Sequence, residues 1–207
     1  ALPIYTPEVI IHTSELRDLV SHQCPINDQI VTLYMELISE THNIPHLSTY
    51  FIPNLIKHGW ETVQNYFANP NRRRGSRSLH RPKMTVDKCI LIPTYLINSH
   101  WVAIARREIN EKIYFFYNDD MNNPNTEADL KRIFTSCTNN EFYPPNTTWI
   151  KCNSHYYLPH SNECGARMLL AIHIMALHPL PHNSILLPLM HSNLAQITRT
   201  WIAATLL

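Results

Sequence analysis

The long apolar run from Ala166 to Leu177 is the feature that most constrains how this chain can fold. As a helix it presents apolar side chains nearly all round, and such a helix is stable only in a protein interior. Asn162-Glu163-Cys164-Gly165 directly precedes the run. The positive end of the helix dipole favours a thiolate at Cys164, and Gly165 beside it lets a substrate backbone come close. The sequence therefore predicts a nucleophile at the start of a buried helix.

Two neighbouring segments, Trp101–Arg106 and Ile113–Tyr117, are apolar on both faces, which is typical of central strands in a covered sheet. Together with the buried helix they predict an α+β fold, and 207 residues suit a single domain, residues 1–207. The other expected elements are strands Cys89–Pro93 and Trp149–Cys152, and helices Gln29–Ile38 (with Asn27 or Asp28 as N-cap), Pro53–Phe67, Ala128–Phe134 and Ile185–Leu207, the last broken at Pro188.

Composition narrows the class of protein. Hydrophobic residues make up 44% of the chain and the net charge is +1, which is typical of a globular protein and argues on charge grounds against a nucleic-acid-binding role. The five cysteines are scattered without a C-x-x-C pair, which indicates no disulfide framework and an intracellular protein, cytoplasmic or nuclear. No segment is long and apolar enough for a membrane span. Nothing in the composition implies a cofactor or an oligomeric state.

The most basic stretch, Arg72-Arg73-Arg74 with Arg77, is interpreted as a solvated surface loop, because turn-forming residues surround it. The alternative is a docking patch for an acidic protein or for nucleic acid.

A histidine and an aspartate flank the hairpin between the two central strands. If its turn centres on Ile109-Asn110, His100 faces Asp119. Residues directly opposite each other have Cβ atoms roughly 5 Å apart, close enough for a carboxylate to hold an imidazole. In this register Asp120 points to the other face and is a poorer partner for His100.

The three side chains together suit nucleophilic catalysis. Cys164 would attack a carbonyl carbon, His100 would stabilise the thiolate and protonate the leaving amine, and Asp119 would fix the histidine tautomer. The predicted reaction is acyl transfer to water.

At these residues the chain resembles the SUMO/sentrin-specific cysteine proteases, a papain-like family that cleaves ubiquitin-like modifiers after a diglycine. Four motifs occur in the family's order: Pro25-Ile26-Asn27-Asp28, Ile92-Pro93 with His100-Trp101, Asp119-Asp120-Met121, and Glu163-Cys164-Gly165. The resemblance implies a papain-like fold, with a helical part that carries Cys164 and a mixed sheet that carries His100 and Asp119. It also implies conjugates of ubiquitin or a ubiquitin-like protein as substrates.

Two positions depart from the family pattern. Pro25 replaces a tryptophan that helps to roof the diglycine tunnel, so Trp101 alone remains to cover a substrate tail. Leu158 stands where the family has its oxyanion glutamine. The backbone N–H of Cys164 can supply half of an oxyanion hole. Asn162 and His160 are our first candidates for the rest, and Asn153 and His155 stay open.

Other interpretations remain. Cys152, His155, His160 and Cys164 could enclose zinc, although their spacing is irregular and our expectation is that there is no metal. The same fold could also serve a viral or mobile-element processing protease, or a protein-binding module whose catalysis is weak.

Overall fold

The computed structural model describes residues 5–6, 9–10, 12–21, 24–63, 89–96, 100–137, 141–152, 162–177 and 194–206. The helices of this part are α1 (Thr13–Ser21), α2 (Asp28–His42), α3 (Phe51–His58), α4 (Trp60–Val63), α6 (Thr126–Phe134), α7 (Cys164–Leu177), α9 (Leu194–Thr205) and the 3-10 turn η1 (Thr135–Cys137). The strands are β1 (Tyr5–Thr6), β2 (Val9–Ile10), β3 (Cys89–Leu96), β4 (His100–Ile109), β5 (Lys112–Asn118) and β6 (Thr148–Lys151).

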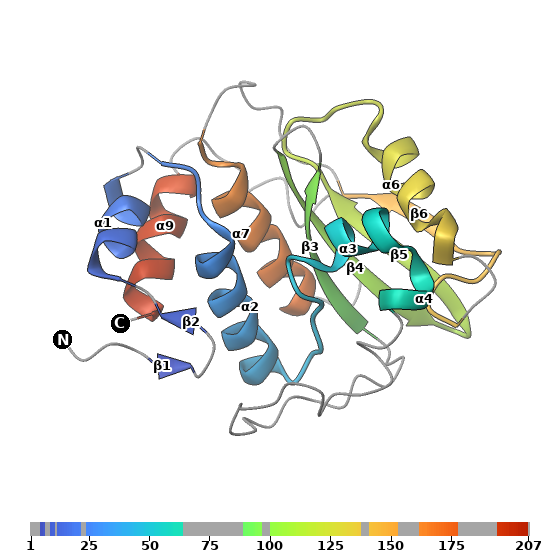
Figure 1. The fold of residues 1–207 in the computed structure, drawn as a ribbon, viewed down its shortest axis with the longest axis horizontal. Coiled ribbons are helices and arrows are strands. Elements are labelled where there is room, and N and C mark those ends of the chain that lie inside the picture. Colours follow the sequence, from blue (N-terminus) through green and yellow to red (C-terminus); the bar gives the residue numbers. More distant parts are fainter. Residues whose placement is uncertain are drawn as a thin grey trace.

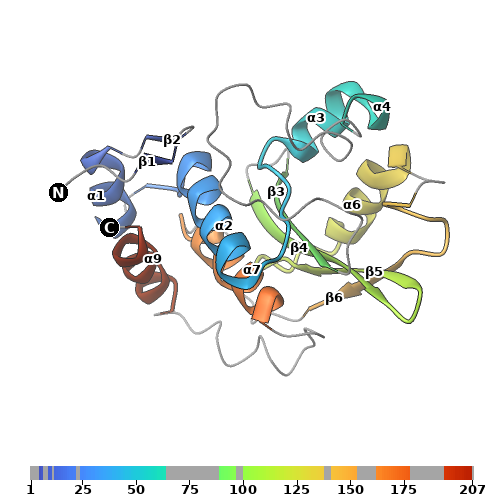
Figure 2. The same ribbon diagram turned by 90° about the horizontal axis from the view of Figure 1, so that it is seen from below.

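The centre of the molecule is a mixed four-stranded sheet in the order β3-β4-β5-β6. β3, β4 and β5 pair antiparallel, whereas β6 runs parallel to β5. Helices α2 and α7 lie on one side of the sheet, and α3, α4 and α6 lie on the other (Figures 1 and 2). This arrangement confirms the expected α+β fold.

The alternation of side chains along β4 divides the interior into two cores. Trp101, Ala103 and Ala105 belong to the core formed with α2 and α7. Val102 and Ile104 belong to the core beneath α3 and α6. Because successive side chains of a strand point to opposite faces, a strand between two cores must be apolar throughout. That is the pattern by which the sequence predicted a covered sheet.

The turn between β4 and β5 differs from the prediction by one residue. Ile109 pairs with Lys112, so the turn consists of Asn110 and Glu111 rather than Ile109 and Asn110. Both turn residues have positive φ angles, 50° and 62°, as the favoured two-residue hairpin turn requires. The register of the hairpin therefore shifts by two residues, and His100 and Asp119 are not directly opposed. A shift of two residues keeps every side chain on its own face, since the alternation has a period of two.

The start of α2 is as predicted. Asn27 is the N-cap, and its Oδ1 accepts a hydrogen bond of 2.9 Å from the backbone N–H of Ile30. The described part of the expected Pro53–Phe67 helix is divided into α3 and α4 at Gly59, whose φ of 72° favours glycine, and residues 64–67 lie outside the described residues. The basic stretch Arg72–Arg77 lies outside the described residues, so its interpretation as a loop stays a prediction.

The sequence analysis did not anticipate α1, which packs beside α9 in the layer that lies beyond α2 and α7 from the sheet (Figure 1). All five cysteines are free thiols, as expected for a chain without a disulfide framework. Among the helices that the structure describes, none combines the length and the hydropathy needed to cross a bilayer.

Candidate active site

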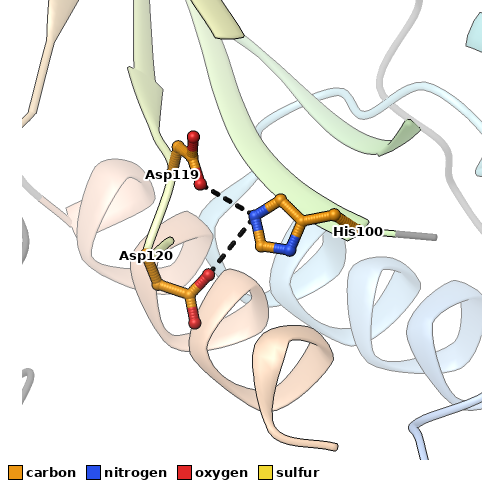
Figure 3. Close-up of side chains that lie close together, drawn as sticks. All are labelled: His100, Asp119 and Asp120. Atoms are coloured by element: carbon orange, nitrogen blue, oxygen red, sulfur yellow. Dashed lines mark hydrogen bonds and ion pairs between the residues drawn. The ribbon is translucent and has the colours of Figure 1, made fainter. Parts of the chain in front are cut away.

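His100 and Asp119 form a buried pair at the end of the central sheet. The Nε2 of His100 lies 2.8 Å from Oδ1 of Asp119, and the two side chains are 5% and 0% exposed (Figure 3). His100 is the first residue of β4, and Asp119 directly follows β5. The two residues are diagonal rather than opposed neighbours, but they share one face of the hairpin, so their side chains still meet.

The loop between β5 and α6 holds Asp119 in place. The backbone N–H groups of Met121 and Asn123 each donate to its carboxylate at 3.0 Å, and the hydroxyl of Thr126 donates as well. Burial alone would raise the pKa of Asp119, but the hydrogen bonds from His100, Thr126 and Asn123 lower it below its usual range. Asp119 is therefore a fixed carboxylate.

Asp120 is a second carboxylate at the same histidine, which corrects the prediction that it points away. Its Oδ1 lies 3.3 Å from Nε2 of His100, and only 5% of its side chain is exposed. Figure 3 shows both carboxylates directed at one ring nitrogen. The prediction failed because β5 ends at Asn118, and strand alternation does not hold in the turn that follows.

Cys164 is the first residue of α7 and is partly exposed. Its thiol acts on His100 as a hydrogen-bonding partner that raises the pKa of the imidazole. Since Nε2 of the imidazole faces the carboxylates, the nitrogen left for the thiol is Nδ1. Burial alone would lower the pKa of His100, but the hydrogen bonds with Asp119 and Cys164 and the charges of both carboxylates raise it to about 10. At neutral pH the ring is an imidazolium, the partner that a thiolate requires.

The other thiols lie in different environments. Cys137 and Cys152 are buried, and burial raises the pKa of both to about 12. Burial also raises the pKa of Cys89, and Cys24 is exposed. Only Cys164 lies beside an acid–base group of the described site.

The two residues predicted to bind substrate lie side by side. A Cβ on Gly165 would come within 3.4 Å of Cδ1 of Trp101 and within 2.9 Å of the Cβ of Ile26. Trp101 is 6% exposed, and the centroid of its ring lies 4.9 Å from that of Tyr95. Besides the predicted approach of a substrate backbone, close packing against Ile26 thus requires glycine at position 165. The substrate-binding roles of Gly165 and Trp101 stay predictions.

The segment before Cys164 is held by a buried arginine that the sequence analysis overlooked. Arg199 of α9 is 0% exposed and donates to the backbone carbonyls of Asn162 and of Leu19, the latter at 3.3 Å. Asn162 is itself exposed, so it stays a candidate for oxyanion contact. His160, Asn153, His155 and Leu158 lie outside the described residues, which leaves their proposed roles and the zinc hypothesis as predictions.

A second overlooked arginine is Arg167, whose side chain is 2% exposed inside the apolar helix α7. It contacts Glu163 and Asp120. The signal that could have revealed it is a charged residue within an otherwise apolar run, since arginine is almost never fully buried without partners.

His100, Asp119 and Asp120 also have the side-chain types of a metal site, with ligand atoms within 4.8 Å of one another. The Asp119 carboxylate, however, already accepts hydrogen bonds from the imidazole, from Thr126 and from backbone amides. The arrangement is accounted for as a hydrogen-bonded ion-pair cluster.

Comparisons with known proteins place the chain in a family. A domain model described as the Ulp1 protease family, C-terminal catalytic domain, matches residues 25–204. A comparison with curated protein sequences gives no match. Among solved structures, the SUMO protease Ulp1 with its catalytic cysteine oxidized to a sulfenic acid has a TM-score of 0.71 at 16% identity, covering 98% of this chain and 86% of that one.

Two further structures are similar in fold. The Ulp1 protease domain in complex with Smt3, the yeast orthologue of SUMO, has a TM-score of 0.69 at 17% identity, covering 100% of this chain and 86% of that one. XopD from Xanthomonas has a TM-score of 0.51 at 14% identity, covering 87% and 98%. Because the family model matches residues 25–204, most of the chain, this chain belongs to the Ulp1 protease family and is a cysteine protease.

Proposed function

We propose that Cys164, His100 and Asp119 form the catalytic triad of this cysteine protease. The observation that carries the proposal is the buried His100 imidazole, held at 2.8 Å by Asp119 and hydrogen-bonded to the thiol at the start of α7. A residue of β4, a residue of the loop after β5 and the first residue of α7, all remote in sequence, thus come together at one place. A thiolate, an imidazolium and an orienting carboxylate are the groups that acyl transfer requires.

In the proposed reaction the Cys164 thiolate attacks the carbonyl carbon of the scissile bond. The N–H at Nδ1 of His100 then protonates the departing amine, which leaves a thioester on Cys164. His100, now neutral, takes a proton from water, and the resulting hydroxide attacks the thioester and releases the acid and the thiolate. Asp119 keeps Nε2 protonated and the ring oriented throughout, and the backbone N–H of Cys164 stabilises the oxyanion.

For the substrate, we propose the peptide or isopeptide bond that follows a ubiquitin-like modifier, with the SUMO class first. Membership of the Ulp1 protease family supports this choice, as does the fold shared with an Ulp1 domain bound to Smt3. Trp101 would cover the modifier tail where it enters the site, and Asn162 or His160 would complete the oxyanion hole. We also propose a location in the cytoplasm or nucleus, which conjugates of this kind and five free thiols support.

We further propose that residues 1–207 act as a single catalytic domain. Both cores share one sheet, and α9 contacts the segment that leads to Cys164, so no described part of the chain is independent of the site.

Electrophilic probes test the nucleophile and the substrate class together. Propargyl probes of SUMO, ubiquitin and other modifiers are incubated with the native chain, with Cys164→Ala and with Cys24→Ala, which removes the exposed control thiol. The expected result is an adduct with the SUMO probe in the native chain and Cys24→Ala, and none in Cys164→Ala. An adduct that persists in Cys164→Ala would exclude this nucleophile.

The same experiment separates the alternative functions. Labelling of Cys164 by a generic thiol reagent but by none of the modifier probes would indicate a processing protease with another substrate. Inertness of Cys164 to both reagents would indicate a binding module.

A further inference from the structure

The carboxylate of Asp120 joins the imidazole of His100 to a buried arginine. Its Oδ1 lies 3.3 Å from Nε2 of His100, and its Oδ2 lies 3.8 Å from Nε of Arg167. Asp120 is 5% exposed, so its charge has little solvent to stabilise it. A buried carboxylate without a nearby cation protonates or is strongly destabilising.

Arg167 connects Asp120 to Glu163, the residue that precedes Cys164. It lies one turn beyond Cys164 on α7, and its Nη2 donates a hydrogen bond of 3.1 Å to Oε2 of Glu163. The backbone N–H of Arg167 also donates to the carbonyl of Glu163, in the first turn of the helix. One arginine therefore contacts both the start of α7 and the second carboxylate at His100.

We propose that Arg167 is a positioning residue for the reaction: it holds Asp120 as a second anion against His100 and, through Glu163, fixes the helix turn that presents Cys164. The inference rests on the proposed triad. The imidazolium would then be stabilised by Asp119 and Asp120, and Arg167 would keep the second anion in place.

The charges around the site favour this arrangement. The groups that face His100 are Asp119 and Asp120 from the loop after β5, and Cys164 from α7, with Arg167 behind Asp120. Burial and the charge of Asp119 raise the pKa of Asp120 above its usual range, although the charges of His100 and Arg167 act to lower it. Without Arg167 the Asp120 carboxylate is no longer held against His100, and the imidazolium loses one of its anions.

The direction in which the pKa of His100 changes on removal of Arg167 distinguishes two roles for the arginine. If Arg167 were only a nearby positive charge, its removal would make His100 harder to deprotonate. If Arg167 holds Asp120 as an anion, its removal makes His100 easier to deprotonate, as Asp120→Asn does. An opposite charge at this range shifts a pKa by about 1 unit or more.

The test follows the rate of Cys164 alkylation by iodoacetamide against pH, with site-resolved mass spectrometry. The rate changes when the neighbouring imidazolium loses its proton, so its alkaline transition reports His100. We expect that transition to move down by about one pH unit in Arg167→Gln and in Asp120→Asn, and no further in the double variant. Arg167→Lys keeps the charge and should restore most of the native profile.

Several results would overturn the proposal. One is a transition that moves up in Arg167→Gln, and another is one that stays at the native pH in Asp120→Asn. Shifts that add in the double variant would show that Arg167 and Asp120 act separately. A purely structural role would lower the melting temperature and leave the transition unmoved. If Arg167→Gln does not fold, Asp120→Asn and Arg167→Lys still give the comparison.

Alkylation needs no modifier substrate, so the two proposals can fail separately. An unmoved transition with normal SUMO-probe labelling rejects the role of Arg167 alone. A native chain whose Cys164 reacts no faster than the exposed Cys24, and shows no alkaline transition, rejects the triad and the role of Arg167 together.

Discussion

Gly165 and Ile26 are so close that a methyl group on the glycine would lie 2.9 Å from the Cβ of the isoleucine. Real Cβ atoms do not approach so closely, and Ile26 is 4% exposed among buried neighbours. The start of α7 therefore packs directly against Ile26, the residue that precedes the N-cap of α2.

Gly165→Ala should destabilise the protein by about 1–3 kcal/mol, because overpacking forces the start of α7 away from Ile26. Displacement of Cys164 should also slow its labelling by a SUMO probe. Urea denaturation and labelling rates measure the two effects. The control is Ile26→Gly, which removes the contacting Cβ: Gly165→Ala should cost less in that background, and equal costs in both backgrounds would contradict the contact.

Asp119→Asn should lower kcat/KM by about 100-fold or more, since an amide cannot hold Nε2 of His100 protonated in the same way. The variant also loses acceptor capacity for Met121 and Asn123, so the loop after β5 should loosen. Hydrolysis of a fluorogenic SUMO amide measures the rate. Thr126→Ser keeps the hydroxyl donor to Asp119 and should stay within a few-fold of the native rate. Asp119→Asn at native rate would exclude the orienting role.

We expect the contribution of His100 to the free energy of unfolding to fall as the pH rises from about 6.5 to about 10. The folded protein holds the His100 proton up to a pKa of about 10, whereas the unfolded chain releases it near 6.5. In that window the folded state binds more protons, so the free energy of unfolding decreases as the pH rises. The difference in unfolding free energy between the native chain and His100→Gln should shrink across this range, and a constant difference would reject the raised pKa.

Thiol reagents at neutral pH should distinguish the five cysteines. Burial raises the pKa of Cys137 and Cys152 to about 12, so iodoacetamide should leave both unmodified in the folded protein. Cys164 should react first and the exposed Cys24 more slowly. Peptide mapping after a short exposure gives the order, and guanidinium provides the control in which all thiols react. Modification of Cys137 before Cys164 would contradict the site.

Glu111→Gly should stabilise the protein by about 1 kcal/mol, because Glu111 holds a φ of 62° that costs an ordinary residue energy. The matched control is Glu108→Gly, an exposed strand position that is not among the positive-φ residues. It should destabilise the hairpin. Thermal unfolding of both variants measures the difference, and the same sign for both would reject the turn geometry.

The sequence was sufficient for the elements that a local pattern determines. Both-face hydrophobicity located β4 and β5, and the adjacent N-cap candidates Asn27 and Asp28 marked the start of α2, where the structure has Asn27 as the N-cap. The contact between His100 and Asp119 was also predicted, because an error of two in register leaves the strand faces unchanged and Asp119 directly follows the last residue of β5.

What the sequence did not reveal depends on the ends of elements and on distant contacts. Asp120 reaches His100 only because β5 stops at Asn118, and no local pattern fixes that residue. Arg167 and Arg199 are buried among partners contributed by other segments. Whether a buried arginine can be satisfied is decided by tertiary packing, which a single sequence does not display.

The hydrogen bond from Arg199 to the carbonyl of Asn162 makes α9 part of the support for the segment before Cys164. A ribosome synthesises α9 after His100, Asp119 and Cys164, so a nascent chain that has not yet reached α9 carries the three proposed triad residues without this hydrogen bond. We therefore expect a shortened chain that ends before α9 to hold Cys164 less firmly than the full chain does.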